Sequence, residues 1–230
     1  AISTARSRSA APPTAANGAR VVVNDVGHVQ GKALGNAAKV VAEIEAAGGK
    51  AVPSFDSVAT AAGAEKIVAA AVSAFGRIDI LVNNAATNPH FGPMVTADDG
   101  AFDKTFEVNV KGYFAATRAV AKHLIERGSP GAIVNVASVV GFIGSPMQGV
   151  YAMTKAAVIS MTKTLAMELG TAGIRVNAIA PGLVDTKFAS ALTQNEEILN
   201  MVLQRTALKR VGQPDDIAGA ALYLASDASQ

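Results

Sequence analysis

The sequence predicts an α/β fold in which helices cover both faces of one doubly wound parallel sheet. From residue 19 onward, two patterns alternate along the chain. Short apolar runs with no polar alternation are typical of strands that are buried on both faces. Longer segments with apolar residues at helical spacing separate these runs. Because repeated strand–helix alternation with short connections indicates a doubly wound sheet, we predict one domain over residues 19–230.

The predicted strands are rich in β-branched residues, and glycines follow several of the predicted helices. We expect strands at residues 21–23, 51–55, 78–82, 132–136 and 174–179. We expect helices at residues 33–47, 61–75, 102–126, 151–169, 194–208 and 215–225. Gly48, Gly76, Gly128 and Gly170 stand where a C′ glycine commonly ends a helix.

The composition excludes several classes of protein. Half of the 230 residues are hydrophobic, which is typical of a globular rather than a disordered chain. No apolar stretch reaches the roughly 18 residues that a membrane span needs. The net charge is only +2 and the basic residues are scattered, so the sequence shows no basic patch of the kind that binds nucleic acid. The chain has no cysteine, and its histidines have no ligand spacing, so we expect a cytoplasmic protein without a metal site.

Residues 1–18 do not fit the alternating pattern. They are rich in Ala, Ser, Arg and Pro, and they contain no acidic residue. The dipeptide at residues 12–13, Pro-Pro, would break a helix interior. One interpretation is a transit-like leader, because such segments share this composition. We favour a disordered or altered N-terminal segment.

Tyr151 and Lys155 form the most informative pair in the sequence. They stand four residues apart in a predicted helix, so their side chains leave the same helix face. A phenol is a poor base because its pKa is about 10, and a nearby ammonium favours the phenolate. The pair therefore indicates acid–base chemistry, although Tyr and Lys also share helix surfaces simply as solvated neighbours.

Further polar residues lie where ligands bind to open α/β sheets, beyond the carboxyl ends of strands. Residues 83–86, Asn-Asn-Ala-Ala, follow one predicted strand, and Ser138 follows another. Asn109 lies in an otherwise apolar helix, where a buried amide needs hydrogen-bond partners. The loop at residues 181–186 reads Pro-Gly-Leu-Val-Asp-Thr. Each feature alone has a structural explanation, but their joint order indicates a binding site.

Together these motifs resemble the short-chain dehydrogenase/reductase family, in its compact single-domain branch with a Rossmann-like sheet. The resemblance covers about residues 17–229. Residues 83–86 look like the family's Asn-Asn-Ala-Gly motif with alanine in the last position, and residues 212–217 match a segment before the family's last helix. The residues that match the family's catalytic tetrad are Asn109, Ser138, Tyr151 and Lys155.

The resemblance implies an oxidoreductase that interconverts a secondary alcohol and a ketone by hydride transfer with NAD(P). Tyr151 would be the acid/base, and Ser138 would stabilise charge on the reacting oxygen. Lys155 would lower the pKa of Tyr151 and bind the nicotinamide ribose, and Asn109 would hold a water that links Lys155 to solvent. The implied cofactor-binding residues are Asp25, Asp56, Ser57, Asn84, Ala85, Tyr151, Lys155, Pro181, Gly182, Val184 and Thr186.

Asp25 predicts NAD as the cofactor, with NADP as the alternative. It follows the predicted strand at residues 21–23, where a carboxylate accepts hydrogen bonds from both adenosine ribose hydroxyls and repels a 2′-phosphate. No Arg or Lys follows until Lys32, so a 2′-phosphate has no evident counter-charge. The competing interpretation is a turn-forming Asp before Gly27.

The sequence departs from the family pattern at both ends. The family's first strand and its Thr-Gly-x-x-x-Gly-x-Gly loop, which binds the pyrophosphate, are not found before residue 19. We therefore expect a sheet that lacks the family's first strand, with two unpaired inner edges, and also its last strand. We hypothesise that residues 1–16 reflect a frameshifted or mis-started reading of the glycine-loop helix.

Two functions follow from these observations. The first is an NAD-dependent oxidoreductase, and the alternative is a catalytically impaired homologue that acts as a binding or interaction protein. An epimerase or dehydratase is disfavoured because such relatives carry a larger C-terminal substrate domain. The resemblance also implies a homotetramer or homodimer through the helices at residues 102–126 and 151–169.

The substrate stays open beyond a small-molecule alcohol or carbonyl compound. Residues 85–89 resemble carbonyl-reducing relatives, whereas residues 24–27 and 56–57 resemble relatives that oxidise hydroxyacyl-CoA. The expected pocket wall is mostly apolar with one amide, and each member has loop packing as its competing explanation. Its residues are Phe91, Pro93, Phe142, Met147, Gln148, Leu183 and Phe188.

Overall fold

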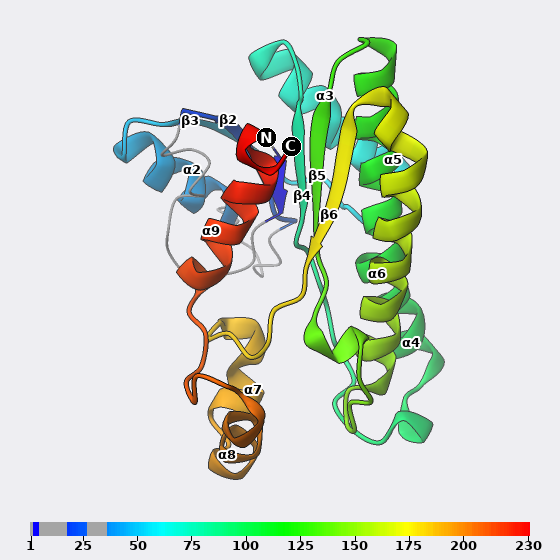
Figure 1. Cartoon of the computed structure of the whole chain (residues 1–230), viewed down its shortest axis with the longest axis vertical. Coiled ribbons are helices and arrows are strands. Elements are labelled where there is room, and N and C mark those ends of the chain that lie inside the picture. The colour runs from blue at the N-terminus through cyan, green and yellow to red at the C-terminus, as the bar shows by residue number, and fades with distance from the viewer. Residues whose placement is uncertain (1, 5–17, 27–35) are drawn as a thin grey trace.

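The structure, a computed structural model, describes residues 2–4, 18–26 and 36–230. These ranges form a six-stranded parallel sheet with the order β3-β2-β1-β4-β5-β6 (Figure 1). The strand order reverses between β1 and β4, at the kind of switch point where doubly wound sheets bind ligands. The strands are β1 (Ile2–Thr4), β2 (Arg20–Asn24), β3 (Lys50–Ser54), β4 (Ile80–Asn83), β5 (Gly131–Val136) and β6 (Ile174–Ile179).

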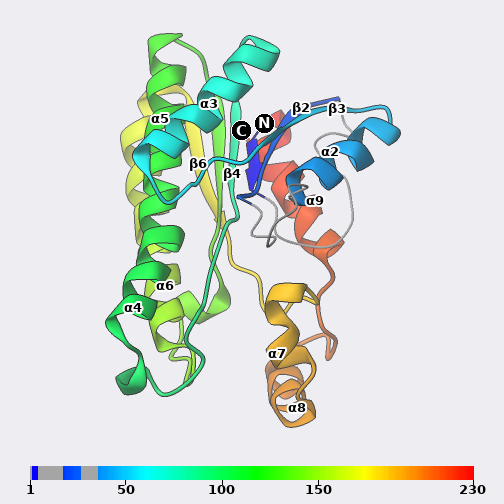
Figure 2. The same ribbon diagram turned by 180° about the vertical axis from the view of Figure 1, so that it is seen from behind.

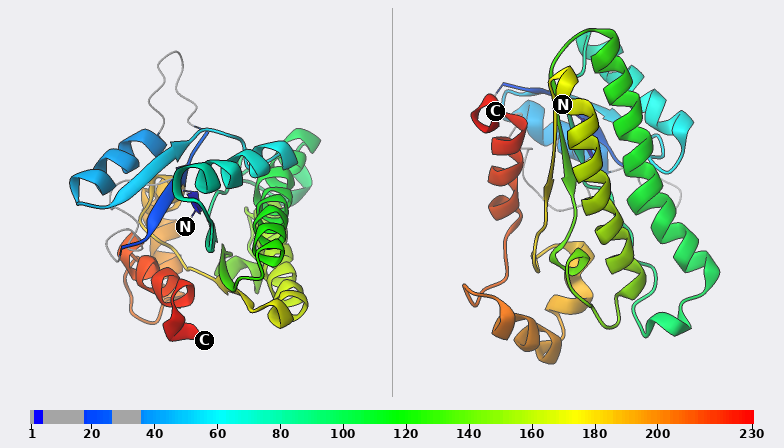
Figure 3. Two further views of the ribbon diagram at one scale, coloured as in Figure 1. Left: turned by 90° about the horizontal axis from the view of Figure 1, so that it is seen from above. Right: turned by 45° about the vertical axis from the view of Figure 1, so that its right-hand side comes forward.

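Helices cover both faces of this sheet. One face carries α3, α5 and α6, and the other carries α2 and α9, as the opposite views and the view from above show (Figures 2 and 3). The short helices α7 and α8 lie beyond the carboxyl ends of the strands (Figure 1). The helices are α2 (Asn36–Ala46), α3 (Ala61–Phe75), α4 (Asp99–Phe106), α5 (Gly112–Glu126), α6 (Gly149–Leu169), α7 (Ser190–Thr193), α8 (Glu196–Arg205) and α9 (Pro214–Ala225).

The core has a layer on each side of the sheet. Val22 packs with Leu81 and Ile133 in the layer beneath α3 and α5. Val21 and Val23 face the opposite layer, which lies beneath α2. Because successive residues of β2 point to opposite faces and both faces are covered, the strand has no polar alternation. This is the pattern that predicted the fold class, and the prediction is confirmed.

The predicted absence of the first strand is wrong. β1 pairs in parallel with β2, where Ile2 lies opposite Val22, and with β4, where Ile2 lies opposite Leu81. The central position is therefore filled, and neither neighbour has an unpaired inner edge. Ile2–Thr4 is short and mostly hydroxyl-bearing, so it contains no apolar run that would mark it as a strand. Residues 5–17, on which the altered-segment hypothesis also falls, lie outside the described residues.

The other predicted elements are present with small shifts in their bounds, except that the start of the helix predicted at residues 33–47 lies outside the described residues. α3 and β6 have the predicted bounds. The helix predicted at residues 102–126 begins earlier, at Asp99, and contains a π-helical turn at Glu107–Lys111. The helix predicted at residues 194–208 is preceded by the separate helix α7. Between residues 180 and 230 the described chain adds no further strand to the sheet.

The glycine that ends α6 was predicted incorrectly. Gly170 has a φ of −58°, an ordinary right-handed conformation, and the chain continues through a 3-10 turn. Gly173 then takes the left-handed conformation with a φ of 72°. Gly76 has the predicted left-handed conformation after α3, as do Gly48 and Gly128 after their helices. In the described ranges, no helix is long and apolar enough to cross a membrane.

Candidate active site

The residues of the predicted tetrad come from separate elements near the carboxyl edge of the sheet. Ser138 follows the end of β5, Tyr151 and Lys155 lie in the first turns of α6, and Asn109 lies in the π-helical turn between α4 and α5. The turn after β5 approaches α6 closely, because a Cβ added to Gly141 would lie 2.8 Å from the carbonyl carbon of Lys155. This contact brings Ser138 and the start of α6 to the same place.

Lys155 is buried, with 1% of its surface exposed. Its Nζ donates a hydrogen bond to the carbonyl oxygen of Val136 at 2.7 Å. The same nitrogen lies 5.4 Å from the ring centroids of both Tyr113 and Tyr151. Burial lowers the pKa of Lys155 to about 7, because a charged ammonium loses its hydration there. Lys155 therefore changes its charge near neutral pH.

Tyr151 has a raised rather than a lowered pKa. Burial is the largest cause and raises the pKa of Tyr151 to about 12, while a hydrogen bond between the Ser138 and Tyr151 side chains acts to lower it. Burial thus outweighs the effects that lower this pKa in the protein alone, and the expected effect of Lys155 on it stays a prediction. The loss of hydration opposes the phenolate, and the same burial also disfavours the ammonium that was expected to stabilise it.

Asn109 is fully buried and joins two parts of the site. Its Oδ1 accepts a hydrogen bond from the backbone N–H of Thr87 at 2.8 Å. Its Nδ2 donates to the carbonyl oxygen of Thr87 at 3.0 Å and to Oγ1 of Thr154 at 3.1 Å. Both amide protons are thus used, and the side chain clamps the loop after β4 to α6. The predicted water at Asn109 would have to donate a hydrogen bond to the second lone pair of Oδ1. Alternatively, it would bind a backbone carbonyl that the π-helical turn leaves without a partner.

A chain of buried polar side chains beneath the site was missed in the sequence. Asn83 Nδ2 donates to Thr117 Oγ1 at 3.1 Å and to Asn135 Oδ1 at 2.9 Å. Asn135 Nδ2 in turn donates to Thr162 Oγ1 at 2.9 Å. These residues connect α5, β4, β5 and α6 beneath the tetrad. The available signal was Asn135, a polar residue inside the otherwise apolar run at residues 132–136.

The residues predicted to bind the adenosine end lie at the carboxyl ends of β2 and β3. Asp25 is 7% exposed, and its Oδ2 accepts a hydrogen bond from Asn36 Nδ2 at 3.1 Å. Asn24 Nδ2 donates to the carbonyl oxygens of Ser54 at 3.2 Å and of Asp56 at 2.9 Å, which joins the ends of these strands. Ser57 follows in the same loop.

The loop at residues 181–186 lies against Ser138. The N–H of Val139 donates to the carbonyl oxygen of Pro181 at 3.0 Å, and Gly212 N–H donates to that of Leu183 at 2.9 Å. Val184 forms an isolated parallel bridge with Gly212, and Thr186 Oγ1 accepts from the N–H of Ala189 at 3.3 Å. The segment at residues 212–217 therefore anchors this loop.

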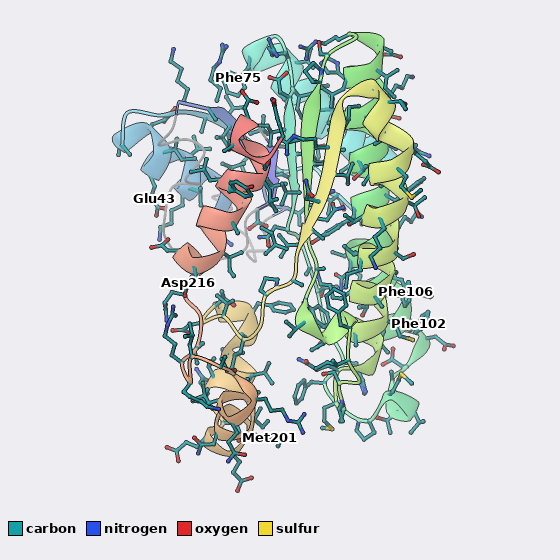
Figure 4. The ribbon with its side chains drawn as sticks, viewed as in Figure 1. Glu43, Phe75, Phe102, Phe106, Met201 and Asp216 are labelled. Carbon is teal, nitrogen blue, oxygen red and sulfur yellow. The ribbon has the colours of Figure 1, made fainter. Side chains whose placement is uncertain are left out.

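An ion pair between Arg210 and Asp216 holds the segment at residues 212–217 at the start of α9. Arg210 binds both carboxylate oxygens of Asp216, at 2.7 and 3.0 Å. Asp216 also accepts the N–H of Gln213 at 2.7 Å, and it lies at the lower end of α9 in Figure 4. Arg210 is the largest cause that lowers the pKa of Asp216, so the pair stays charged near neutral pH.

Part of the predicted pocket wall lies close to Tyr151. The ring of Phe188 is 5.8 Å from the ring of Tyr151, centroid to centroid. Gly92 N–H donates to the carbonyl oxygen of Met147 at 2.9 Å, which joins two of the loops that carry predicted wall residues. Phe188 and Met147 are 44% and 41% exposed, so these apolar surfaces remain accessible.

The positions of the predicted cofactor-binding residues indicate where a dinucleotide would bind. Asp25 and Asp56 follow the neighbouring strands β2 and β3. Asn84 and Ala85 follow β4, and Ser138 follows β5. Polar groups thus line the carboxyl edge from β3 to β5 across the switch point, where such a ligand binds an open α/β sheet. The residues present fit a dinucleotide at this edge. The phosphate-binding loop would fall on residues 5–17, outside the described ranges.

Comparison with known proteins decides the family. A family model described as "Enoyl-(Acyl carrier protein) reductase" matches residues 7–230. The human protein "Dehydrogenase/reductase SDR family member 4" is 37% identical over 213 residues, which are 93% of this chain and 74% of the human protein. The chain belongs to the short-chain dehydrogenase/reductase (SDR) family. The family match begins at residue 7, so it includes much of the segment that the motifs placed outside the resemblance.

Other SDR proteins with similar sequences or structures include sugar dehydrogenases. L-rhamnose 1-dehydrogenase (NAD(P)(+)) of Azotobacter vinelandii is 38% identical over 220 residues, covering 96% of this chain and 85% of that protein. The crystal structure of a gluconate 5-dehydrogenase from Burkholderia cenocepacia, in complex with NADP and tartrate, has a TM-score of 0.87 and 33% identity. The structural match covers 95% of this chain and 83% of the gluconate 5-dehydrogenase chain. This chain is thus an SDR oxidoreductase homologue, and the comparisons do not decide between NAD and NADP.

Proposed function

We propose that the protein is an NAD-dependent oxidoreductase that interconverts a secondary alcohol and a ketone, with Tyr151 as the acid/base. The observation that carries this proposal is the meeting of Ser138, Tyr151 and Lys155 at the carboxyl edge of the sheet. The Ser138 hydroxyl is close enough to Tyr151 to act on its pKa, which supports the binding of one substrate oxygen by both hydroxyl groups. Lys155 lies beneath the Tyr151 ring.

The proposed roles follow from this geometry. In the reduction direction, the Tyr151 phenol gives its proton to the substrate oxygen, and the Ser138 hydroxyl donates a hydrogen bond to the same oxygen. A bound nicotinamide supplies the hydride to the substrate carbon, and in the oxidation direction it accepts one. Because burial raises the pKa of Tyr151 to about 12, the phenol form is fully populated at neutral pH. Tyr151 therefore carries at neutral pH the proton that reduction needs, whereas oxidation needs a Tyr151 that can accept a proton.

The experiment that tests this function is replacement of Tyr151 by phenylalanine. We expect Y151F to lose about 10²–10⁴-fold in kcat, because the ring remains but the transferable proton is removed. The assay would screen alcohols, sugars and acyl-CoA derivatives with NAD, and the matching ketones with NADH. The matched control is Y223F, since Tyr223 is half-exposed on α9 and lies outside the site.

Two outcomes would contradict the proposal. If Y151F kept more than a tenth of the wild-type turnover, Tyr151 would not be the acid/base. If the folded wild-type protein bound no NADH at millimolar concentration in a fluorescence titration, the impaired binding homologue would be the better function.

We propose NAD rather than NADP as the preferred cofactor. Asp25 is nearly buried at the end of β2, where it would accept hydrogen bonds from ribose hydroxyls and repel a 2′-phosphate. We expect D25S to lower kcat/KM for NAD and to raise it for NADP, as measured with both cofactors on one substrate. The control is E126Q, a loss of one negative charge at the end of α5. Unchanged discrimination in D25S would remove Asp25 from the cofactor preference.

We propose that copies of the chain associate through α5 and α6. Phe114 on α5 and Met153 and Met167 on α6 are exposed apolar side chains, and the small residue Ala156 is also exposed rather than turned to the sheet. We expect a homotetramer or homodimer in sedimentation velocity, and we expect A156R to dissociate it because a long charged side chain prevents close helix contact. The control is M201R on α8, which Figure 4 shows far from α6. A monomeric wild-type protein would contradict this proposal.

A further inference from the structure

Tyr113 is a buried tyrosine that the tetrad does not include. It is the second residue of α5 and only 1% of its surface is exposed. Its hydroxyl donates a hydrogen bond to the carbonyl oxygen of Val136 at 3.2 Å. This oxygen is also the acceptor for Lys155 Nζ, at 2.7 Å. Two donors thus share one carbonyl oxygen, which has two lone pairs to offer.

The ring of Tyr113 contacts the same ammonium directly. Lys155 Nζ lies over this ring and over the ring of Tyr151, 5.4 Å from each centroid. Both distances fall within the range of about 6 Å in which a cation is attracted to an aromatic face. Burial is the one cause of the lowered pKa of Lys155, so no carboxylate among the described residues offsets its loss of hydration. In the described part of the chain, the ammonium thus interacts with two aromatic rings and one carbonyl oxygen.

The hydroxyl of Tyr113 remains a donor throughout the relevant pH range. Burial, with a smaller effect from Tyr151, raises the pKa of Tyr113 well above its ordinary value. The carbonyl that it binds is also fixed, because Val136 is the last residue of β5 and pairs with Ile179 of β6. Tyr113 therefore presents a rigid ring on one side of Lys155, and it occupies the acceptor site next to the one that Lys155 uses.

We propose that Tyr113 is a positioning residue, whose ring holds the Lys155 ammonium against the Val136 carbonyl and within reach of Tyr151. This inference builds on the proposed function, because it assumes that Lys155 serves the acid/base Tyr151. Tyr113 would act only through Lys155 and would touch neither substrate nor cofactor. Its ring should favour the charged form of Lys155 and thereby extend the pH range over which that charge is present.

The test replaces Tyr113 with phenylalanine and then with mono-, di- and trifluorophenylalanine at this position alone. Fluorine atoms weaken the negative face of the ring while its shape changes little, so a packing role would not respond to the series. We expect the pKa of Lys155 to fall stepwise, by about 1 in total, because the ring stabilises the ammonium less at each step. The readout is the pH titration of the ¹³Cε signal of Lys155 by NMR, assigned by its absence from K155M.

The matched control places the same fluorinated residues at Phe75. This residue ends α3, away from the proposed interface, and lies under Arg20 rather than Lys155. The Lys155 titration should not move in that series. A constant Lys155 titration across the position-113 series would overturn the proposal. Because the readout needs no turnover, a stepwise shift in a protein that fails as an oxidoreductase would leave the proposal standing and remove only the proposed function.

Activity provides a second measurement. The alkaline limb of the kcat/KM profile, where Lys155 loses its charge, should move to lower pH along the fluorinated series. We expect Y113L, which removes the ring entirely, to move this limb at least as far as the trifluoro variant does. If Y113L lowers Tm but leaves the profile of the folded fraction unchanged, Tyr113 is only a core residue and the inference is wrong.

Discussion

Replacement of Lys155 by methionine is expected to abolish turnover and, at the same time, to stabilise the fold below neutral pH. Lys155 is buried and has no carboxylate partner among the described residues, so its charged form costs free energy in the folded state. Methionine has similar length and no charge, and it can fill the same space between the rings of Tyr113 and Tyr151. Val136 keeps a donor in this variant, because Tyr113 also binds its carbonyl oxygen.

The direction of the pH dependence follows from the pKa of Lys155 in the two states. This pKa is about 7 in the folded protein, whereas an unburied lysine has a pKa of 10.5. Between these pH values the unfolded chain binds more protons, so this group makes the wild type more stable as pH rises. The destabilisation is complete below pH 7 and disappears above pH 10.5. K155M should therefore exceed the wild type by about 1–4 kcal/mol in unfolding free energy at about pH 6, with the gap closing toward about pH 10.

Urea unfolding at a series of pH values measures this gap, and single-turnover hydride transfer measures the lost activity. K163M is the matched control, because Lys163 lies on the same helix with an exposed side chain. It should change neither the unfolding free energy nor the rate. A K155M variant less stable than the wild type below neutral pH would show that the hydrogen bond to Val136 and the ring contacts outweigh the loss of hydration.

The fold class was predictable because the apolar runs and the helical spacing reflect the same burial on both faces of the sheet. Val21, Val22 and Val23 are all fully buried, and such a strand carries a strong signal. β1 carries no such signal, because Ile2–Thr4 is short and its pairing partners lie far away in the sequence. Its place in the sheet depends on β2 and β4 rather than on its own residues.

The sequence predicted that Tyr151 and Lys155 lie close together, but it did not predict the electrostatics of the pair. Tyr151 and Lys155 were found by their spacing, which a helix converts into proximity. Spacing says nothing about hydration, and it is burial that raises the pKa of one and lowers that of the other. Tyr113 was missed because its nearness to Lys155 comes from the packing of α5 against the end of β5, and neither segment marks the contact in its sequence.

Replacement of Asn109 by leucine is expected to cost both stability and activity. Leucine occupies a similar volume but removes the hydrogen bonds to the N–H and C=O of Thr87 and to Thr154. Leaving such groups without partners costs about 1–3 kcal/mol each when they stay buried, so we expect a loss of about 2–4 kcal/mol in unfolding free energy. Thr87 lies in the loop after Asn84 and Ala85, so the predicted nicotinamide end should become less ordered.

N109D separates the hydrogen bond that Asn109 accepts from the two hydrogen bonds that it donates. An aspartate retains the acceptor for the Thr87 N–H but offers no proton to the Thr87 carbonyl or to Thr154, so its stability should fall between those of the wild type and N109L. T105V is the control, because Thr105 is equally buried but donates only within its own helix, to Ala101 at 2.6 Å. Urea unfolding and kcat/KM for NAD measure both effects. If N109L matched T105V in both, the loop after β4 would be held by its other contacts. Asn109 would then have to act through a bound water rather than through the clamp.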